Sequence, residues 1–223
     1  METVGDVLDA GHPADDPALV TPRREYDYRR FRATADKTGN YLRHCGVGRG
    51  ATVAVLDTPI PEAIFGFLGA GLLGGTVAFA PEGRVDAKVL LGPTGDLDDY
   101  AVEPGCKRIA VGEAPDDPSW AYFEREVWSE NPFFPESPAD PDGDLLPDWT
   151  QREAIAAAET LASDLSPADR VAIRGSLADP GTVVAGVLAP LVAGAAVVLP
   201  GADLEGTVAV GGDGPEARTL SLP

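Results

Sequence analysis

The sequence contains few of the residues that build metal sites, disulfide frameworks or nucleophilic triads. It has two cysteines, Cys45 and Cys106, and two histidines, His12 and His44. Two cysteines so far apart match neither a disulfide framework nor the ligand spacing of a zinc site. Two histidines give little support to a histidine metal centre or to a Ser-His-Asp triad. The sequence therefore predicts no catalytic, cofactor-binding or metal-binding residues.

Lysine is also scarce. Three lysines and 14 arginines face 36 acidic residues, 22 of them aspartates, so the net charge is -19. This charge repels phosphate backbones and anionic headgroups, which argues against nucleic acids and acidic membranes as partners. Molar salt shortens the Debye length to about 3 Å and screens the self-repulsion of such a surface. We therefore expect a halophilic protein from a halophilic archaeon.

The N-terminus has neither the basic region nor the apolar core of a secretion signal, so we expect a cytoplasmic protein. Two uncharged runs, 63–80 and 180–202, nevertheless reach the length of a membrane span. Each run breaks at small residues, 74–75 or 193–194, and then continues as a β-type segment. Acids rather than Lys or Arg flank both runs. We predict a helix followed by a buried strand in each, and no role in a membrane.

These runs belong to an internal repeat. Residues 65–81 match 184–200 at an offset of 119, and 52–55 match 170–173 at an offset of 118. A helical pattern precedes each copy, so both halves have the order helix, strand, helix, strand. Alternating strands and helices of this length indicate parallel sheets covered by helices. The predicted fold class is α/β, with two repeated helix-strand-helix-strand units that form parallel sheets flanked by helices.

The repeat also predicts the domain organisation. We expect a flexible N-terminal segment at 1–18, a first α/β unit at 19–130, a connector rich in proline and acids at 131–148, and a second α/β unit at 149–223. Thr150 and Glu153 have the spacing of a capping box at the start of a helix.

Further elements are expected outside the repeat: strands at 88–91 and 108–111, an amphipathic helix at 119–130 with Trp120, Phe123 and Trp128 in the core, and a hairpin between 207–210 and 217–222. Two glycine-rich segments, 92–95 and 211–214, are most simply turns rather than phosphate loops. Asp57 and Asp179 follow paired strands, where α/β folds place ligands. Their simplest role is nevertheless that of helix caps or loop acids.

Four short motifs suggest a family: a hairpin ending at 26–28, a helix end at 45–50, a helix start at 61–63 and a glycine turn at 74–75. In this order they make residues 19–81 resemble the opening of AMP-forming acyl-CoA synthetases, the adenylate-forming ligases. The segment from Asp148 to Pro200 is similar to the next helix, strand and helix of that family. The resemblance implies the fold of the large N-terminal domain of acyl-CoA synthetases, and it spans about the first third of such an enzyme.

The resemblance also implies a Gly/Ser/Thr-rich loop ending in Lys, just before the helix that begins at Thr150, to bind ATP phosphates. The segment from Glu136 to Asp148 has instead one Gly, no Lys or Arg and five acids. A loop that often contains His in the family has the sequence Ser176 to Pro180 here. The family's adenine motif and its C-terminal catalytic Lys lie beyond the stretch that the chain covers. We therefore expect common ancestry without adenylation.

The sequence-based hypothesis is a truncated acyl-CoA synthetase-like protein, a pseudoenzyme without the ATP phosphate-binding loop. It would have a regulatory or assembly role, through a protein partner or as a homo-oligomer. The first alternative is a subunit of a split AMP-forming acyl-CoA ligase, an acid-thiol ligase that is inactive alone. The second is a small-molecule binder that keeps an acyl or CoA pocket.

Overall fold

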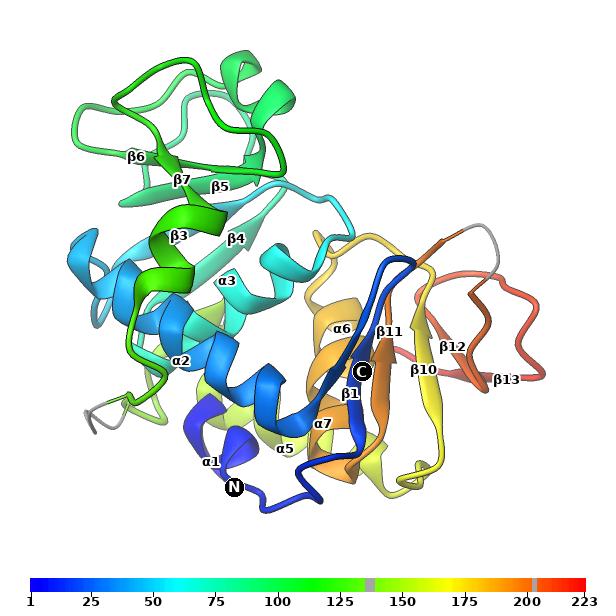
Figure 1. Cartoon of the computed structure of the whole chain (residues 1–223). Coiled ribbons are helices and arrows are strands. Elements are labelled where there is room, and N and C mark those ends of the chain that lie inside the picture. The colour runs from blue at the N-terminus through cyan, green and yellow to red at the C-terminus, as the bar shows by residue number, and fades with distance from the viewer. Residues whose placement is uncertain (135–138, 202–203) are drawn as a thin grey trace.

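The computed structural model describes residues 1–134, 139–201 and 204–223 (Figure 1). Residues 135–138 of the predicted connector lie outside the described residues. The α-helices are α1 (Val4–Leu8), α2 (Tyr28–His44), α3 (Pro61–Leu72), α4 (Phe123–Glu126), α5 (Gln151–Ala162), α6 (Pro180–Val183) and α7 (Ala189–Ala193). Two 3₁₀ turns, η1 (Thr94–Asp99) and η2 (Val127–Ser129), and one π turn, η3 (Val184–Leu188), complete the helical elements.

Most strands belong to two mainly parallel sheets that reproduce the sequence repeat. One sheet has the order β4 (Thr76–Phe79), β3 (Thr52–Val55), β5 (Val89–Pro93), β6 (Lys107–Val111), β7 (Ala121–Tyr122). The other has the order β13 (Arg218–Leu220), β12 (Val208–Val210), β10 (Arg170–Ile173), β11 (Ala196–Val198), β1 (Pro17–Val20), β2 (Glu25–Asp27). The order β4-β3-β5-β6 of the first sheet recurs as β11-β10-β12-β13 in the second. The predicted fold class is therefore confirmed.

The two apolar runs form a helix and a strand each, as predicted. Residues 63–80 contain most of α3 and all of β4, whereas 180–202 contain α6, η3, α7 and β11. Proline at the first helical position starts both helical segments, where its missing N–H costs nothing. Both helices are apolar on all sides because they lie in the interior, between a sheet and other helices. Within the described parts of the chain, no helix combines the length and apolar character that a bilayer crossing needs.

The N-terminal region contributes to the sheet of the second half. Residues 1–18, predicted to be a flexible segment, contain α1, whose Val4 and Val7 are buried, and the first residues of β1. Although β1 and β2 fall in the predicted first unit, β1 pairs in parallel with β11 (Figure 1). One continuous core includes side chains from both halves. The predicted domain boundaries stay predictions.

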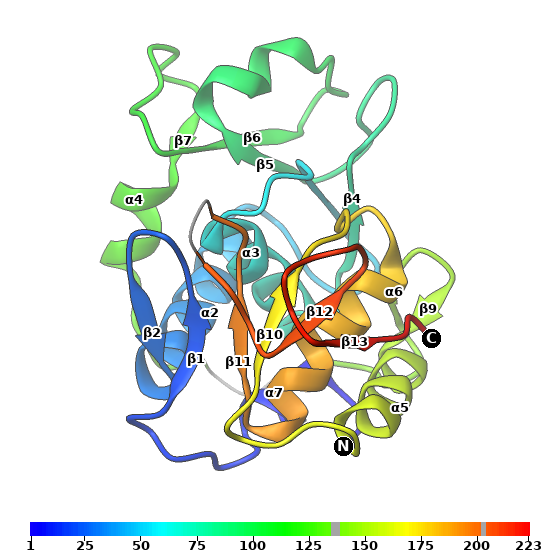
Figure 2. The ribbon, with the colours of Figure 1, turned by 90° about the vertical axis from the view of Figure 1, so that its right-hand side faces the viewer.

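Two predicted elements are wrong. The segments 207–210 and 217–222 do not form a hairpin, because β12 and β13 pair in parallel (Figure 2). The amphipathic helix at 119–130 is replaced by β7, which pairs with β6, followed by the single turns α4 and η2. Phe123 is buried as expected, but Trp128 is 46% exposed.

Helices α2 and α3 pack closely because glycines meet at their crossing. A Cβ atom built on Gly69 of α3 would lie 2.8 Å from the backbone N of Gly39 and 3.1 Å from the carbonyl carbon of Thr38 in α2. Only glycine allows two helix backbones to approach so closely. This contact places α3 between α2 and the first sheet.

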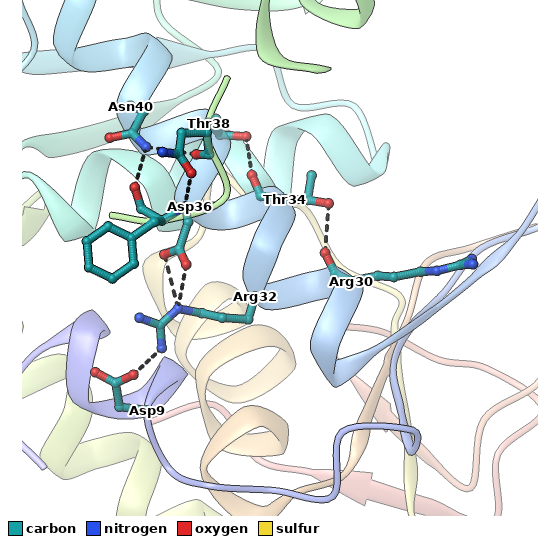
Figure 3. Close-up of polar contacts among 9 residues, drawn as sticks. Asp9, Arg30, Arg32, Thr34, Asp36, Thr38 and Asn40 are labelled. Atoms are coloured by element: carbon teal, nitrogen blue, oxygen red, sulfur yellow. Dashed lines mark hydrogen bonds and ion pairs between the residues drawn. The ribbon is translucent and has the colours of Figure 1, made fainter. Parts of the chain in front are cut away.

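Polar side chains of α2 bind two neighbouring chain segments, the end of α1 and residues 131–133 (Figure 3). The buried Asp36 accepts two hydrogen bonds of 3.0 Å from Nε of Arg32, whose guanidinium also pairs with Asp9 at the end of α1. Burial raises the pKa of Asp36 although Arg32 opposes this effect. The amide of Asn40 donates to the carbonyls of Asn131 and Phe133, both at 3.0 Å. These contacts hold residues 131–133 against α2.

Candidate functional site

The position of the expected phosphate-binding loop is occupied by a tight turn. Strands β8 (Asp144–Leu146) and β9 (Trp149–Thr150) pair antiparallel, and only Pro147 and Asp148 connect them. Asp148 has a left-handed backbone with φ of 63°. The next residues form the predicted capping box, in which Thr150 and Glu153 satisfy each other's backbone N–H groups. The turn is too short to surround a triphosphate.

The arginines near this hairpin already form ion pairs with carboxylates. Arg49 pairs with Asp140 at 3.2 Å, and Arg152 pairs with Asp142 at 2.9 Å and also with Glu2. All these groups lie on the surface, where such pairs contribute about 1 kcal/mol or less. No Lys or Arg occurs between Asp140 and Trp149. The hairpin and its neighbours thus present mainly negative charge.

The loops that follow β3 and β10 meet where the two repeats join. The carboxylate of Asp57 accepts a hydrogen bond of 2.6 Å from the Ser176 hydroxyl and one of 2.9 Å from the backbone N–H of Leu177. Asp57 lies two residues after β3, and Ser176 lies three residues after β10. Asp179 caps α6 by accepting from the Gly181 N–H at 2.8 Å. Both acids therefore have the structural contacts of a loop acid and a helix cap.

A cation at the end of β10 is neutralised within the protein. Arg174 directly follows this strand, and its guanidinium binds the fully buried carboxylate of Glu216 and donates to the Leu204 carbonyl at 2.8 Å. The Gly206 N–H donates a further bond of 3.0 Å to Glu216. The Arg174 partner lowers the pKa of Glu216 to about 2. Arg174 is thus committed to an internal ion pair, which the sequence did not suggest.

A cavity of about 470 Å³ lies beside Asp57. Its charged lining consists of Asp57, Asp96 and Asp99, so it repels phosphate. Over the parts of the chain that the structure describes, no group of three or more His, Cys, Asp or Glu side chains is arranged to hold a metal ion.

The remaining residues with possible chemistry lie apart from one another. A ring nitrogen of His12 is 2.7 Å from the Leu191 carbonyl, whereas His44 faces Glu130 at 3.3 Å. Cys45 and Cys106 are free thiols, and burial raises the pKa of both. Low thiolate content makes such cysteines poor nucleophiles.

The N-terminal part of the chain matches known proteins in sequence. Residues 8–83 match the model of the AMP-binding enzyme family. This segment resembles the AMP-binding enzymes. Over 73 residues the chain is also 40% identical to the 3-hydroxybenzoate–CoA ligase of Aromatoleum sp. (strain CIB), a match that covers 33% of this chain and 14% of the ligase.

Solved ligase structures have the same fold over nearly the whole chain. The anthranilate CoA ligase AuaEII, solved with anthranoyl-AMP, superposes with a TM-score of 0.79 at 18% identity over 93% of this chain. A benzoate CoA ligase from Burkholderia xenovorans LB400 superposes with a TM-score of 0.75 at 17% identity over 95% of this chain. The chain spans about half the length of these ligases, 49% and 50%. The predicted fold, that of the N-terminal domain of acyl-CoA ligases, is confirmed. The match of residues 8–83 supports the predicted resemblance to AMP-forming ligases.

Proposed function

We propose that this relative of the AMP-forming acyl-CoA ligases is non-catalytic and acts by binding, as a regulatory or assembly protein. The observation that carries this proposal is the two-residue connection between β8 and β9, where the family relationship implies a loop that surrounds phosphates. Backbone N–H groups and a Lys would have to come from that loop. Four aspartates, Asp140, Asp142, Asp144 and Asp148, occupy the described part of this segment instead.

The surface next to α2 supports a role in protein binding. In α2, Lys37 donates a hydrogen bond to the backbone carbonyl of Trp128, and Asn40 donates one to that of Phe133. The backbone at both aromatic residues therefore lies against the same helix. Their side chains are 46% and 71% exposed. Exposed aromatic side chains are typical of protein interfaces. This surface is the proposed contact with a partner protein or a second copy.

The first test is nucleotide binding by the purified chain. We expect no heat of binding for ATP or AMP at ligand concentrations up to about 1 mM, because the β8–β9 turn offers no cationic or N–H cradle. Isothermal calorimetry in molar KCl measures this directly, and the 3-hydroxybenzoate–CoA ligase in its own buffer is the positive control. Micromolar binding of either nucleotide would contradict the proposal.

The coverage of the comparisons favours one alternative, a subunit of a split acyl-CoA ligase. The match includes almost all of this chain and only half of each solved ligase. In this case a second polypeptide would supply the phosphate loop and the remaining domain. Affinity capture of the tagged chain from its native cell should then recover a synthetase-like protein, and the mixture should form acyl-CoA. Capture of unrelated partners, without ligase activity, would exclude the alternative.

A further inference from the structure

A second cavity, of about 370 Å³, lies at the carboxyl ends of strands from both sheets. Its walls come from the turn after β1, the start of α3, the ends of β5 and β6, the turns α4 and η2, and the residue Pro200 after β11. Ligands of α/β proteins bind outside the carboxyl ends of parallel strands. The volume is that of a site for a small organic molecule.

Two carboxylates line this cavity. Oε1 of Glu124 accepts a bond of 2.8 Å from the Gly112 N–H, but its Oε2 is buried and has no hydrogen-bond partner among the described residues. Glu62, in the first turn of α3, has no Lys, Arg or His within 4 Å in the described structure. A buried carboxylate oxygen without a partner is costly, so its persistence requires an explanation. A ligand that brings N–H donors and positive charge would remove this cost.

The remaining lining is rigid and largely apolar. Five prolines contribute to the walls together with Ile60 and Val111: Pro22, Pro59, Pro61, Pro93 and Pro200. Trp128 also lines the cavity and offers a half-exposed aromatic face, which attracts cations. Such walls suit the apolar body of a ligand rather than a hydrated metal ion.

Two arginines line the cavity, and within the described structure neither forms an ion pair with its acids. Arg23 and Arg24 are exposed residues of the turn between β1 and β2, and the Arg24 guanidinium lies 5.4 Å from the centroid of the Tyr26 ring. Their charges lower the pKa of Glu62, whereas its burial and the charge of Glu124 raise that pKa more strongly. The arginines thus oppose the rise in the pKa of Glu62 but form no ion pair with it.

We propose that this cavity binds an organic cation, with an ammonium or amidinium group held by Glu62 and Glu124 and an apolar body against the prolines and Trp128. The planar N–H pair of an amidinium matches the two oxygens of a carboxylate. This site is separate from the β8–β9 hairpin. Cation binding therefore neither requires nor excludes the proposed loss of nucleotide binding.

Three probes with the same ring but different charge test the proposal: benzamidine, neutral benzamide and anionic benzoate. We expect calorimetry at the lowest KCl concentration that keeps the chain folded to give a benzamidine Kd at least tenfold below that of benzamide. Benzoate should bind more weakly than benzamidine, because the proposed binding groups are two carboxylates. Equal binding of the three probes, or tightest binding of benzoate, would overturn the proposal.

Isosteric variants locate the site. Glu124→Gln and Glu62→Gln should each raise the benzamidine Kd at least tenfold and leave the benzamide Kd within about twofold. The matched control is Asp96→Asn, which removes the same charge from the cavity beside Asp57. An equal loss in the control would mean that overall charge alone attracts the probe, and the site would be rejected. Two separate variants keep the test decisive if one of them does not fold.

Discussion

Replacement of Gly69 by valine is expected to lower the free energy of unfolding by about 3 kcal/mol or more. The new Cβ would lie 2.8 Å from the backbone N of Gly39, and backbone of an adjacent helix cannot move aside as a side chain can. Helices α2 and α3 would have to separate, which would open the core between both helices and the first sheet. Thermal or denaturant unfolding followed by circular dichroism measures the loss.

Gly66→Ala is the matched control on the same helix. A Cβ at Gly66 would meet only side chains, the nearest being Cδ1 of Leu91 at 3.3 Å. Alanine also gains about 1 kcal/mol in helix propensity over glycine, which offsets a small repacking cost. The control should unfold within about 1 kcal/mol of the parent chain. A Gly69→Val protein as stable as this control would disprove the close packing of α2 against α3.

Substitution of Gln151 by leucine should cost about 1–3 kcal/mol of unfolding free energy. Gln151 is fully buried, and its Oε1 accepts from the Val4 N–H at 2.9 Å while its Nε2 donates to the Gly71 carbonyl at 2.8 Å. Leucine fills the space, and the Gly71 carbonyl still accepts a hydrogen bond from the Gly74 N–H at 3.1 Å. The Val4 N–H is left without its partner, at about 1–3 kcal/mol. The amides of α1 should also exchange faster in hydrogen-exchange mass spectrometry, because this bond holds α1 to α5.

The neighbouring residue gives the control for that experiment. Arg152 lies at the surface and makes its ion pairs with Asp142 and Glu2 there. Arg152→Gln should change stability by less than about 1 kcal/mol, since exposed ion pairs contribute little. If Gln151→Leu is as mild as Arg152→Gln, then Gln151 does not connect α1 to the core.

The repeat made the central part of the fold predictable. Strands such as β3 and β10 are short apolar runs, and their spacing from the apolar helices recurs at a nearly constant offset. Parallel strands buried on both faces produce such runs, so this signal is strong. The capping box at Thr150 was equally visible, because it depends on two residues three positions apart.

Elements at the sheet edges were predicted less well because distant contacts decide them. The glycine-rich stretch 211–214 is typical of a hairpin turn, but Glu216 binds Arg174 and the Gly206 N–H, and these bonds hold the connection where β13 continues parallel to β12. The helical spacing of aromatics at 119–130 was misleading in a similar way. Pairing of β7 with β6 outweighs the local helix preference there.

For the candidate sites, a local sequence pattern was easier to interpret than a cavity built from distant segments. The lack of Lys and the acids from Glu136 to Asp148 are visible in one short stretch of sequence. The cavity with Glu62 and Glu124 is assembled from several separate segments, so no local pattern identifies it. One available signal was an acid directly before an otherwise uncharged helix, since Glu62 precedes the run 63–80. Such a residue enters the interior with the helix that carries it.

The pairing of Leu19 with Val197 has a consequence for biosynthesis. Strand β1 is synthesised long before its parallel neighbour β11, and it can pair with β11 only after the intervening elements have been made. Until then the apolar face of β1 must be covered in another way, by a chaperone or by non-specific collapse of the chain. Completion of the second sheet therefore becomes a late event of folding. Placing residues 1–27 after β13 in the sequence would shorten that wait.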